Sequence, residues 1–280
     1  MRATLFGLFL GGLSLAARYP ATIEIRTAEA AGRRATAPRT PEQQGRDFQW
    51  KGRIAQGKAI EIRGVNGDVR ALAATGPDVE VTAVKRARRS DPEEVKIEVL
   101  EHSDGVTICA VYPSRRWREA NSCEHGESHN HTDNNDVSVE FTVHVPPGVR
   151  FIGATVNGDV GVESLQSDVE VNTVNGSVDV STTGYTEAET VNGSIRAAMK
   201  SATWPGRLDF RTVNGGITLD LPEGVAADVE AQTVNGEVST DFPLTVMGRF
   251  GPRRVNGKIG AGGPRLSLET VNGNIRLRKM

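Results

Sequence analysis

The chain has 280 residues, of which 38% are hydrophobic and 5% aromatic, and its formal net charge at pH 7 is −2. A charge this close to neutral, without a basic stripe interleaved with aromatic side chains, argues against nucleic acid as a partner. The length suits one elongated domain, since stacked repeats bury a continuous interior without forming a globe.

Residues 1–17 have the features of a secretory signal peptide. Arg2 supplies a positive end, residues 5–15 form an apolar run, and residues 14–16 fit a small-x-small cleavage site. The apolar run is too short to cross a bilayer as a helix. We therefore expect an exported protein, periplasmic or at the cell surface or secreted, with no transmembrane span in the mature chain.

Three further regions follow the signal. Residues 18–46 are rich in Ala, Arg and Thr, can bury little, and are expected to form a disordered linker. Residues 47–145 contain alternating apolar positions at irregular spacing, which predicts an irregular β region that covers the N-terminal end of the repeats. Residues 146–280 are predicted to form a repeat β-solenoid.

One repeated phrase organises the chain, namely Val-Asn-Gly followed by any residue and then Val or Ile. It occurs eight times, and Thr precedes six of the copies. Apolar and polar residues alternate on both sides, as in half-buried strands. Asn and Gly together favour positive φ, so each copy is expected to form a corner. The predicted corners are Asn66 and Gly67, Asn157 and Gly158, Asn175 and Gly176, Asn192 and Gly193, Asn214 and Gly215, Asn235 and Gly236, Asn256 and Gly257, and Asn272 and Gly273.

Two all-β architectures fit this pattern. Asn-Gly between alternating runs is a strong hairpin signal, which would give an antiparallel β-hairpin meander. The other architecture is a parallel β-helix or solenoid-like stack of short strands, with one corner in each coil. From Asn157 onward the asparagines are 18, 17, 22, 21, 21 and 16 residues apart, which suits coils of two or three short strands. We prefer the stack and keep the meander as the alternative.

The valine before each Asn gives the second reason for this preference. It would lie in the outward phase of a hairpin, yet it is Val in all eight copies, whereas the residue after the Gly, in the same phase, varies. A solvent-facing site should vary. We therefore expect the eight valines to point inward at the corners of a solenoid, and the Asn side chains to form a hydrogen-bonded ladder.

The same segments carry a resemblance to a known family. The Asn-Gly repeats, the lead-in at residues 58–62, the segment at 108–113 and the Pro-Gly bend at 145–149 are similar to the bacterial putative-adhesin family, over residues 48–280. Its members are exported or envelope-associated β-solenoid proteins of mostly unknown function. The resemblance implies a repetitive β fold at the cell envelope, with an envelope protein or a surface polysaccharide as partner, but a fold does not give a function.

Two groups of residues between 109 and 131 have chemical potential. Cys109 and Cys123 leave no unpaired cysteine, and in an exported protein they are expected to form a disulfide. His125, His129 and His131 lie close to two carboxylates and could ligate Zn²⁺ or Cu²⁺. Their spacing matches no closed structural motif, so a solvated polar loop is the plainer interpretation.

The repeats contain no pattern that indicates catalysis or a cofactor. The outward corner positions, taken in chain order up successive coils, are Asp159, Ser177, Ser194, Gly216 and Glu237, and they form no row of carboxylates. We therefore expect a non-catalytic, adhesin-like scaffold or interaction module of the envelope. A metal-binding or metal-sensing protein that uses residues 123–131 is the alternative, and a carbohydrate-active enzyme on a β-helix is a third possibility.

Overall fold

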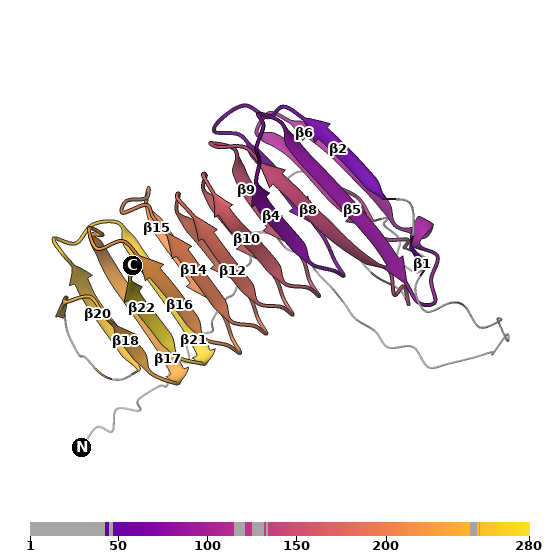
Figure 1. The fold of residues 1–280 in the computed structure, drawn as a ribbon. Coiled ribbons are helices and arrows are strands. Elements are labelled where there is room, and N and C mark those ends of the chain that lie inside the picture. Colours follow the sequence, from indigo (N-terminus) through magenta and orange to yellow (C-terminus); the bar gives the residue numbers. More distant parts are fainter. Residues whose placement is uncertain are drawn as a thin grey trace, which may run out of the picture.

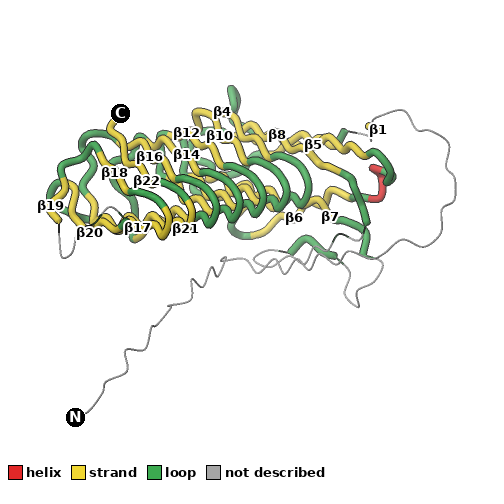
Figure 2. The backbone as a smooth tube through the Cα atoms, turned by 90° about the horizontal axis from the view of Figure 1, so that it is seen from below, coloured by secondary structure: helices red, strands yellow, loops and turns green. Residues whose placement is uncertain are grey.

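The computed structural model describes residues 43–44, 47–114, 121–124, 132, 134–246, 251 and 253–280. The predicted signal peptide and nearly all of the predicted linker lie outside these residues. Within them, regular structure is β-strand apart from one 3-10 turn, η1 (Pro92–Glu94), so the predicted all-β class is confirmed. The strands form an elongated stack of two layers, joined by loops at both edges (Figures 1 and 2).

Each layer is one mixed sheet. The first contains, in spatial order, β1 (Gln43–Gln44), β5 (Val79–Ala87), β8 (Ser138–Val145), β4 (Val69–Ala73), β10 (Val160–Leu165), β12 (Val178–Thr182), β14 (Ile195–Met199), β16 (Ile217–Leu221), β22 (Ile275–Lys279) and β18 (Val238–Thr240), and β2 (Phe48–Gly52) also pairs with β5. The second contains β19 (Leu244–Val246), β20 (Arg254–Ile259), β17 (Ala227–Asn235), β21 (Arg265–Asn272), β15 (Arg207–Arg211), β13 (Thr186–Glu189), β11 (Val169–Asn172), β9 (Arg150–Ala154), β3 (Ala59–Arg63), β7 (Gly105–Val111) and β6 (Lys96–His102).

The stack is a solenoid because the two strands that flank a corner belong to different sheets. β9 lies in the second sheet and β10 in the first, and each pairs with strands of other coils rather than with the other. The pairing of these coils is parallel, with Val160 beside Val69 on one side and Val178 on the other. The preferred solenoid is therefore confirmed, and the hairpin meander is wrong for the repeats.

The core is the narrow space between the two sheets. At every corner except that of the terminal coil, where Val238 is half-buried, the first inward residue is a β-branched side chain with at most 1% of its surface exposed, as at Val160, Val178, Ile195 and Ile217. The opposite sheet contributes side chains such as Phe210, which is fully buried. Burying a side chain of this size stabilises the fold by about 1.5–3 kcal/mol, so the column forms a continuous apolar interior.

The coils do not stack in chain order. The last coil, β21 and β22, lies between the coil of β15 and β16 and the coil of β17 and β18 (Figure 1). The chain therefore builds the terminal coil with β17 and β18, continues into β19 and β20, and then returns. The outward corner position of Asn274 consequently lies between those of Gly216 and Glu237, which corrects the expectation of a simple progression.

The opposite end of the stack is closed by antiparallel strands. β5 pairs with β8, and β6 pairs with β7, so both sheets change from parallel to antiparallel there. The coil of β3 and β4 joins this end to β9 and β10 through parallel pairing. One solenoid coil thus lies within residues 47–145. The division of the chain at residue 146 stays a prediction.

Candidate functional site

The corners that join the second sheet to the first lie in one column, and their asparagine side chains form a ladder. Except at Asn66, the Nδ2 group of each asparagine donates to the Oδ1 atom of the asparagine in the neighbouring coil, at 2.8–2.9 Å. All but Asn66 have exposed side chains. An amide has two N–H donors and two acceptor lone pairs, so each rung retains hydrogen-bonding capacity that faces solvent. The ladder runs through Asn66, Asn157, Asn175, Asn192, Asn214, Asn272 and Asn235.

The corner glycines are required by close stacking of the coils rather than by their backbone angles. Gly67 has a φ of +119°, but the other glycines of the column lie outside the left-handed region, so the predicted positive φ is wrong for them. A Cβ atom on Gly176 would lie 2.0 Å from the carbonyl oxygen of Gly158 in the coil below. Gly193, Gly215 and Gly273 repeat this contact at 1.9–2.0 Å. No side chain fits at these positions unless the coils separate.

The threonine that begins six of the copies has a specific partner. Its buried hydroxyl group donates to the carbonyl oxygen of the corner glycine in the neighbouring coil, as Thr190 does to Gly176 at 2.8 Å and Thr173 to Gly158 at 2.9 Å. Thr155, Thr212, Thr233 and Thr270 make the equivalent bond at 2.8–3.0 Å. The hydroxyl thus joins each coil to the next at the point of closest approach.

The residue after each corner glycine forms another set of bonds. The Oδ1 atom of Asp159 accepts a hydrogen bond of 2.7 Å from the backbone N–H of Ser177, and Asp68 does the same for Asp159 at 2.9 Å. Asn274 accepts from the N–H of Glu237 at 3.0 Å. This position therefore favours a short side chain with an oxygen atom, although its variation suggested a free solvent-facing site.

From Val174 to the terminal coil, the valine before each ladder Asn is exposed or half-buried, which corrects the predicted inward orientation for these copies. Val174 is 37% exposed and Val234 is 55% exposed, while Val191, Val213 and Val271 are half-buried. Val65 and Val156, near the antiparallel end, are buried. Of the four large hydrophobic residues that are exposed in the described part of the chain, two belong to this row. We use the name corner face for these five valines and the ladder asparagine that follows each of them. In stack order the valines are Val174, Val191, Val213, Val271 and Val234.

The eighth copy of the phrase forms no corner. Asn256 and Gly257, predicted as corner residues, lie within β20, which pairs antiparallel with β17 and β19. The Oδ1 atom of Asn256 is buried without a hydrogen-bond partner, and Val255 is 2% exposed. This copy has no parallel corner beside it, so its asparagine cannot join the ladder.

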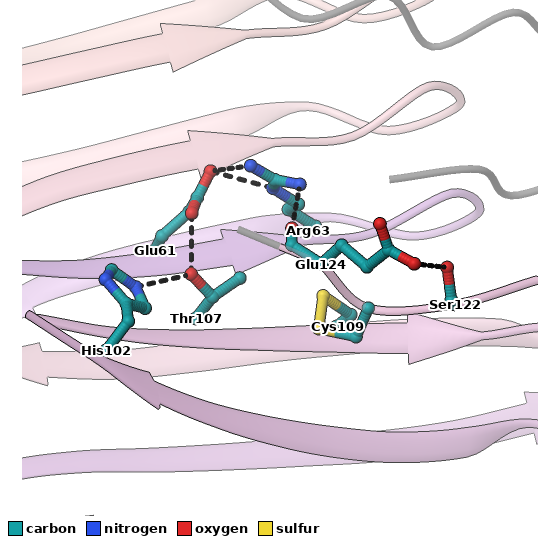
Figure 3. Close-up of a disulfide and its surroundings, with 8 residues drawn as sticks. Glu61, Arg63, His102, Thr107, Cys109, Ser122 and Glu124 are labelled. Atoms are coloured by element: carbon teal, nitrogen blue, oxygen red, sulfur yellow. Dashed lines mark hydrogen bonds and ion pairs between the residues drawn. A yellow bond between two sulfur atoms is a disulfide. The ribbon is translucent and has the colours of Figure 1, made fainter. Parts of the chain in front are cut away.

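A second polar cluster lies beside the disulfide of Cys109 and Cys123, which the structure contains (Figure 3). The Oε1 atom of Glu61 lies 2.7 Å from both Nε and Nη2 of Arg63, and both residues are buried. Thr107 donates to Oε2 of Glu61 at 2.7 Å. Because a buried charge is costly without a partner, these bonds compensate for the burial of the pair.

Residues 121–124 lie over this ion pair and are attached to the sheet in three ways. The disulfide holds Cys123, and Nη1 of Arg63 donates to the carbonyl of Glu124 at 2.9 Å (Figure 3). In addition, Nδ2 of Asn121 donates to the carbonyl of Tyr112 at 2.7 Å. Burial raises the pKa of Tyr112 well above its usual range, so its hydroxyl stays protonated and donates to the carbonyl of Val137. The cluster therefore fixes residues 121–124 against the sheet.

The outer face of the second sheet carries a network of ion pairs. Arg211 contacts Glu189 at 2.9 Å and Asp209 at 3.1 Å. Burial raises the pKa of Glu189 above its usual range, although the guanidinium group of Arg211 acts in the opposite direction. These side chains lie on neighbouring strands and satisfy one another, so the network is structural support for the sheet.

The predicted metal ligands His125, His129 and His131 lie outside the described residues, so metal binding there stays a prediction. In the part of the chain that the structure describes, no group of three or more His, Cys, Asp or Glu side chains is arranged to hold a metal ion. The same part contains no helix with the length and apolar character that a membrane span requires.

Comparison with known proteins identifies the repeat region. The family model described as Toastrack DUF4097 matches residues 152–278. Residues 152–278 are thus similar to the Toastrack domain. The matched residues begin in β9 and end in β22, so the match covers the corners from Asn157 onward and the returning C-terminal coil.

Solved structures with a related arrangement are distant in sequence. A putative cell adhesion protein from Clostridium sporogenes is 9% identical, with a TM-score of 0.48, over 84% of this chain and 100% of the other. A putative adhesin from Bacteroides fragilis is 11% identical, with a TM-score of 0.34, over 84% and 97% of the two chains. A putative lipid binding protein from Parabacteroides distasonis is 9% identical, with a TM-score of 0.26, over the same shares. No curated protein matches the chain.

Proposed function

We propose that this protein is an exported, non-catalytic interaction module of the cell envelope, which binds its partner in an adhesin-like manner through the corner face. The observation that carries the proposal is a row of valines beside the asparagine ladder that point toward solvent. Val174 and Val234 are exposed, and Val191, Val213 and Val271 are half-buried. The threonines, glycines and oxygen-bearing residues of the corners are occupied in joining coils. The valines have no such task, yet they recur at a solvent-facing position.

The shape of the corner face favours an extended partner. Coils of parallel strands repeat at about 4.8 Å, so the face presents an aliphatic group and an amide at that interval along one line. An amide can donate to and accept from a hydroxyl group, and a valine offers an apolar contact next to it. A linear envelope polysaccharide fits this pattern, and so does an extended segment of an envelope protein.

The test replaces Val174, Val191 and Val213 together with Asp. We expect the variant to lose at least about tenfold in affinity for whole cells and for purified envelope polysaccharide, because three charges would have to be desolvated on binding. The matched control places Asp at Ser181, Ala198 and Thr218, which are half-buried outward positions of the first sheet. Co-sedimentation with cells and thermal unfolding are measured for both variants.

Three outcomes would overturn the proposal. Equal loss of binding in the control and the corner variant, with both proteins folded, would remove the corner face as the contact surface. Release of new reducing ends from the polysaccharide by the wild-type protein would show a carbohydrate-active enzyme instead. Detection of the mature chain in the cytoplasm rather than in envelope fractions would contradict export.

A further inference from the structure

The last 16 residues of the chain fill a slot between two coils that precede them in sequence. Leu266 and Leu268 of β21 and Ile275 and Leu277 of β22 point into the core and are at most 1% exposed. Each strand is paired in parallel on both sides, β21 with β15 and β17, and β22 with β16 and β18. The coil is therefore held by other segments on both of its faces.

The corner bonds continue without interruption through this coil. Asn272 donates to Asn214 and accepts from Asn235, both at 2.8 Å, and Thr270 donates to the carbonyl of Gly215 at 2.8 Å. Arg278 makes a two-pronged ion pair with Asp220, at 2.6 and 2.7 Å. The slot thus fixes both the direction and the register of the strand that enters it.

The inserted coil is connected to the rest of the chain through residues 260–264, with sequence Gly-Ala-Gly-Gly-Pro. This connection passes the end of β17, because β20 and β21 lie on opposite sides of that strand. It must therefore span two strand spacings, about 10 Å. Gly260 and Gly262 have φ of +60° and +78°, so the connection turns sharply at both residues.

We propose that the slot is a strand-acceptor site. It can hold residues 265–280 of its own chain or, in their place, residues 265–280 of another copy of this chain. Two copies that exchange these coils reciprocally form a closed, two-fold dimer in which every contact of the inserted coil is preserved. When the connection at residues 260–264 is long enough for the coil to enter the slot of its own chain, the monomer is favoured, since the chain's own coil is present at high effective concentration. When the connection is too short for this, the exchanged dimer is favoured.

The hinge length provides the test. Deleting residues 261–263 leaves three Cα–Cα steps between Ile259 and Arg265, at most about 11 Å when fully extended, which leaves no length for the turn. We expect this variant to be a dimer by light scattering at a concentration where wild type is a monomer. The matched control inserts Gly-Ser-Gly after Gly262, which should keep the protein monomeric.

Cross-linking shows whether the dimer arises by exchange. Thr218 of β16 and Arg276 of β22 are register partners on the outward face of the first sheet. With both replaced by Cys, a short bis-maleimide should give a covalent dimer in the hinge-deletion variant and a covalent monomer in the lengthened control. A non-covalent dimer whose cross-link is intramolecular would overturn the proposal, and so would a monomeric deletion variant.

A second measurement covers the case in which the deletion variant does not fold. A T218C chain and an R276C chain with the natural hinge are unfolded together and refolded at about 100 μM, a concentration chosen so that the second copy competes with the effective concentration of the chain's own coil. Exchange predicts a T218C–R276C hetero-cross-link at least tenfold above that of the two proteins mixed after separate refolding. Equal yields in the two mixtures would overturn the proposal.

Discussion

Residues 190–195 and 254–259 have nearly the same sequence and different structures. The first segment, Thr-Val-Asn-Gly-Ser-Ile, forms a corner whose asparagine bonds to the asparagines on both sides. The second, Arg-Val-Asn-Gly-Lys-Ile, is a continuous antiparallel strand with a buried asparagine oxygen that has no partner. The phrase alone therefore does not bend the chain, because its corner form requires a parallel coil beside it.

Thr is present at the start of the phrase only in copies that lie beside another corner. The six copies that begin with Thr each have a corner glycine in the neighbouring coil, whose carbonyl oxygen accepts the hydroxyl proton. The two copies without Thr have no such acceptor, since Asn66 and Gly67 lie beside residues 137–139, which contain no corner glycine, and Gly257 lies within antiparallel strands. The threonine of the phrase is thus matched to a corner glycine in the neighbouring coil.

The largest difference between the two segments is expected from their glycines. A Cβ atom at Gly193 would lie 1.9 Å from the carbonyl oxygen of Gly176, whereas the nearest atom to a Cβ atom at Gly257 is 3.1 Å away. We expect Gly193→Ala to lower the free energy of unfolding by about 3 kcal/mol, and Gly257→Ala by less than about 1 kcal/mol. Urea unfolding of both variants checks this, and equal losses would show that coil contact is not the cause.

The asparagines should differ by a smaller amount. Asn192→Ala removes two ladder bonds of 2.8 Å and is expected to cost about 1–2 kcal/mol. Asn256→Ala removes a buried oxygen that has no partner, so its effect on unfolding should be near zero. Thermal unfolding by circular dichroism distinguishes the two. A larger loss at Asn256 than at Asn192 would contradict the ladder as a source of stability.

The threonine effect is expected to be about 1 kcal/mol. Thr190→Val keeps the shape of the side chain and removes only the hydroxyl bond to Gly176. The converse change, Arg254→Thr, completes the phrase in the eighth copy but offers the hydroxyl no corner glycine, so stability should stay within about 0.5 kcal/mol. A clear gain from Arg254→Thr in chemical denaturation would mean that the threonine acts locally.

The smallest effect is expected after the glycine. Asp159→Ala removes the acceptor for the N–H of Ser177 and should cost about 0.5–1 kcal/mol. Glu237 occupies the same position in the terminal coil, where no coil follows, so Glu237→Ala should have no measurable effect. Amide hydrogen exchange at Ser177 sharpens the comparison, because its protection should fall in the Asp159 variant.

The sequence predicted the architecture from the repeat but not the orientation of the repeated valine. Spacing and alternation indicated a parallel stack, and the structure contains it. The inward orientation predicted for the valines is wrong for Val174 and Val234, which are exposed while the neighbouring threonines are buried. Side chains alternate between inward and outward along a strand, but this alternation does not continue unchanged through a corner. The alternation in the sequence therefore cannot show which of two adjacent corner residues points inward.

The sequence specifies the features by which each coil contacts a neighbour. These are strand periodicity, a glycine where two backbones touch, a threonine that donates a hydrogen bond and an asparagine that extends the ladder. The sequence also paired Cys109 with Cys123, because the chain contains no other cysteine. The tertiary structure alone decided which coil lies next to which, and so placed β21 and β22 between earlier coils and left Asn256 in a flat strand. The physical reason is that identical coils offer identical edges, so local sequence does not specify their order.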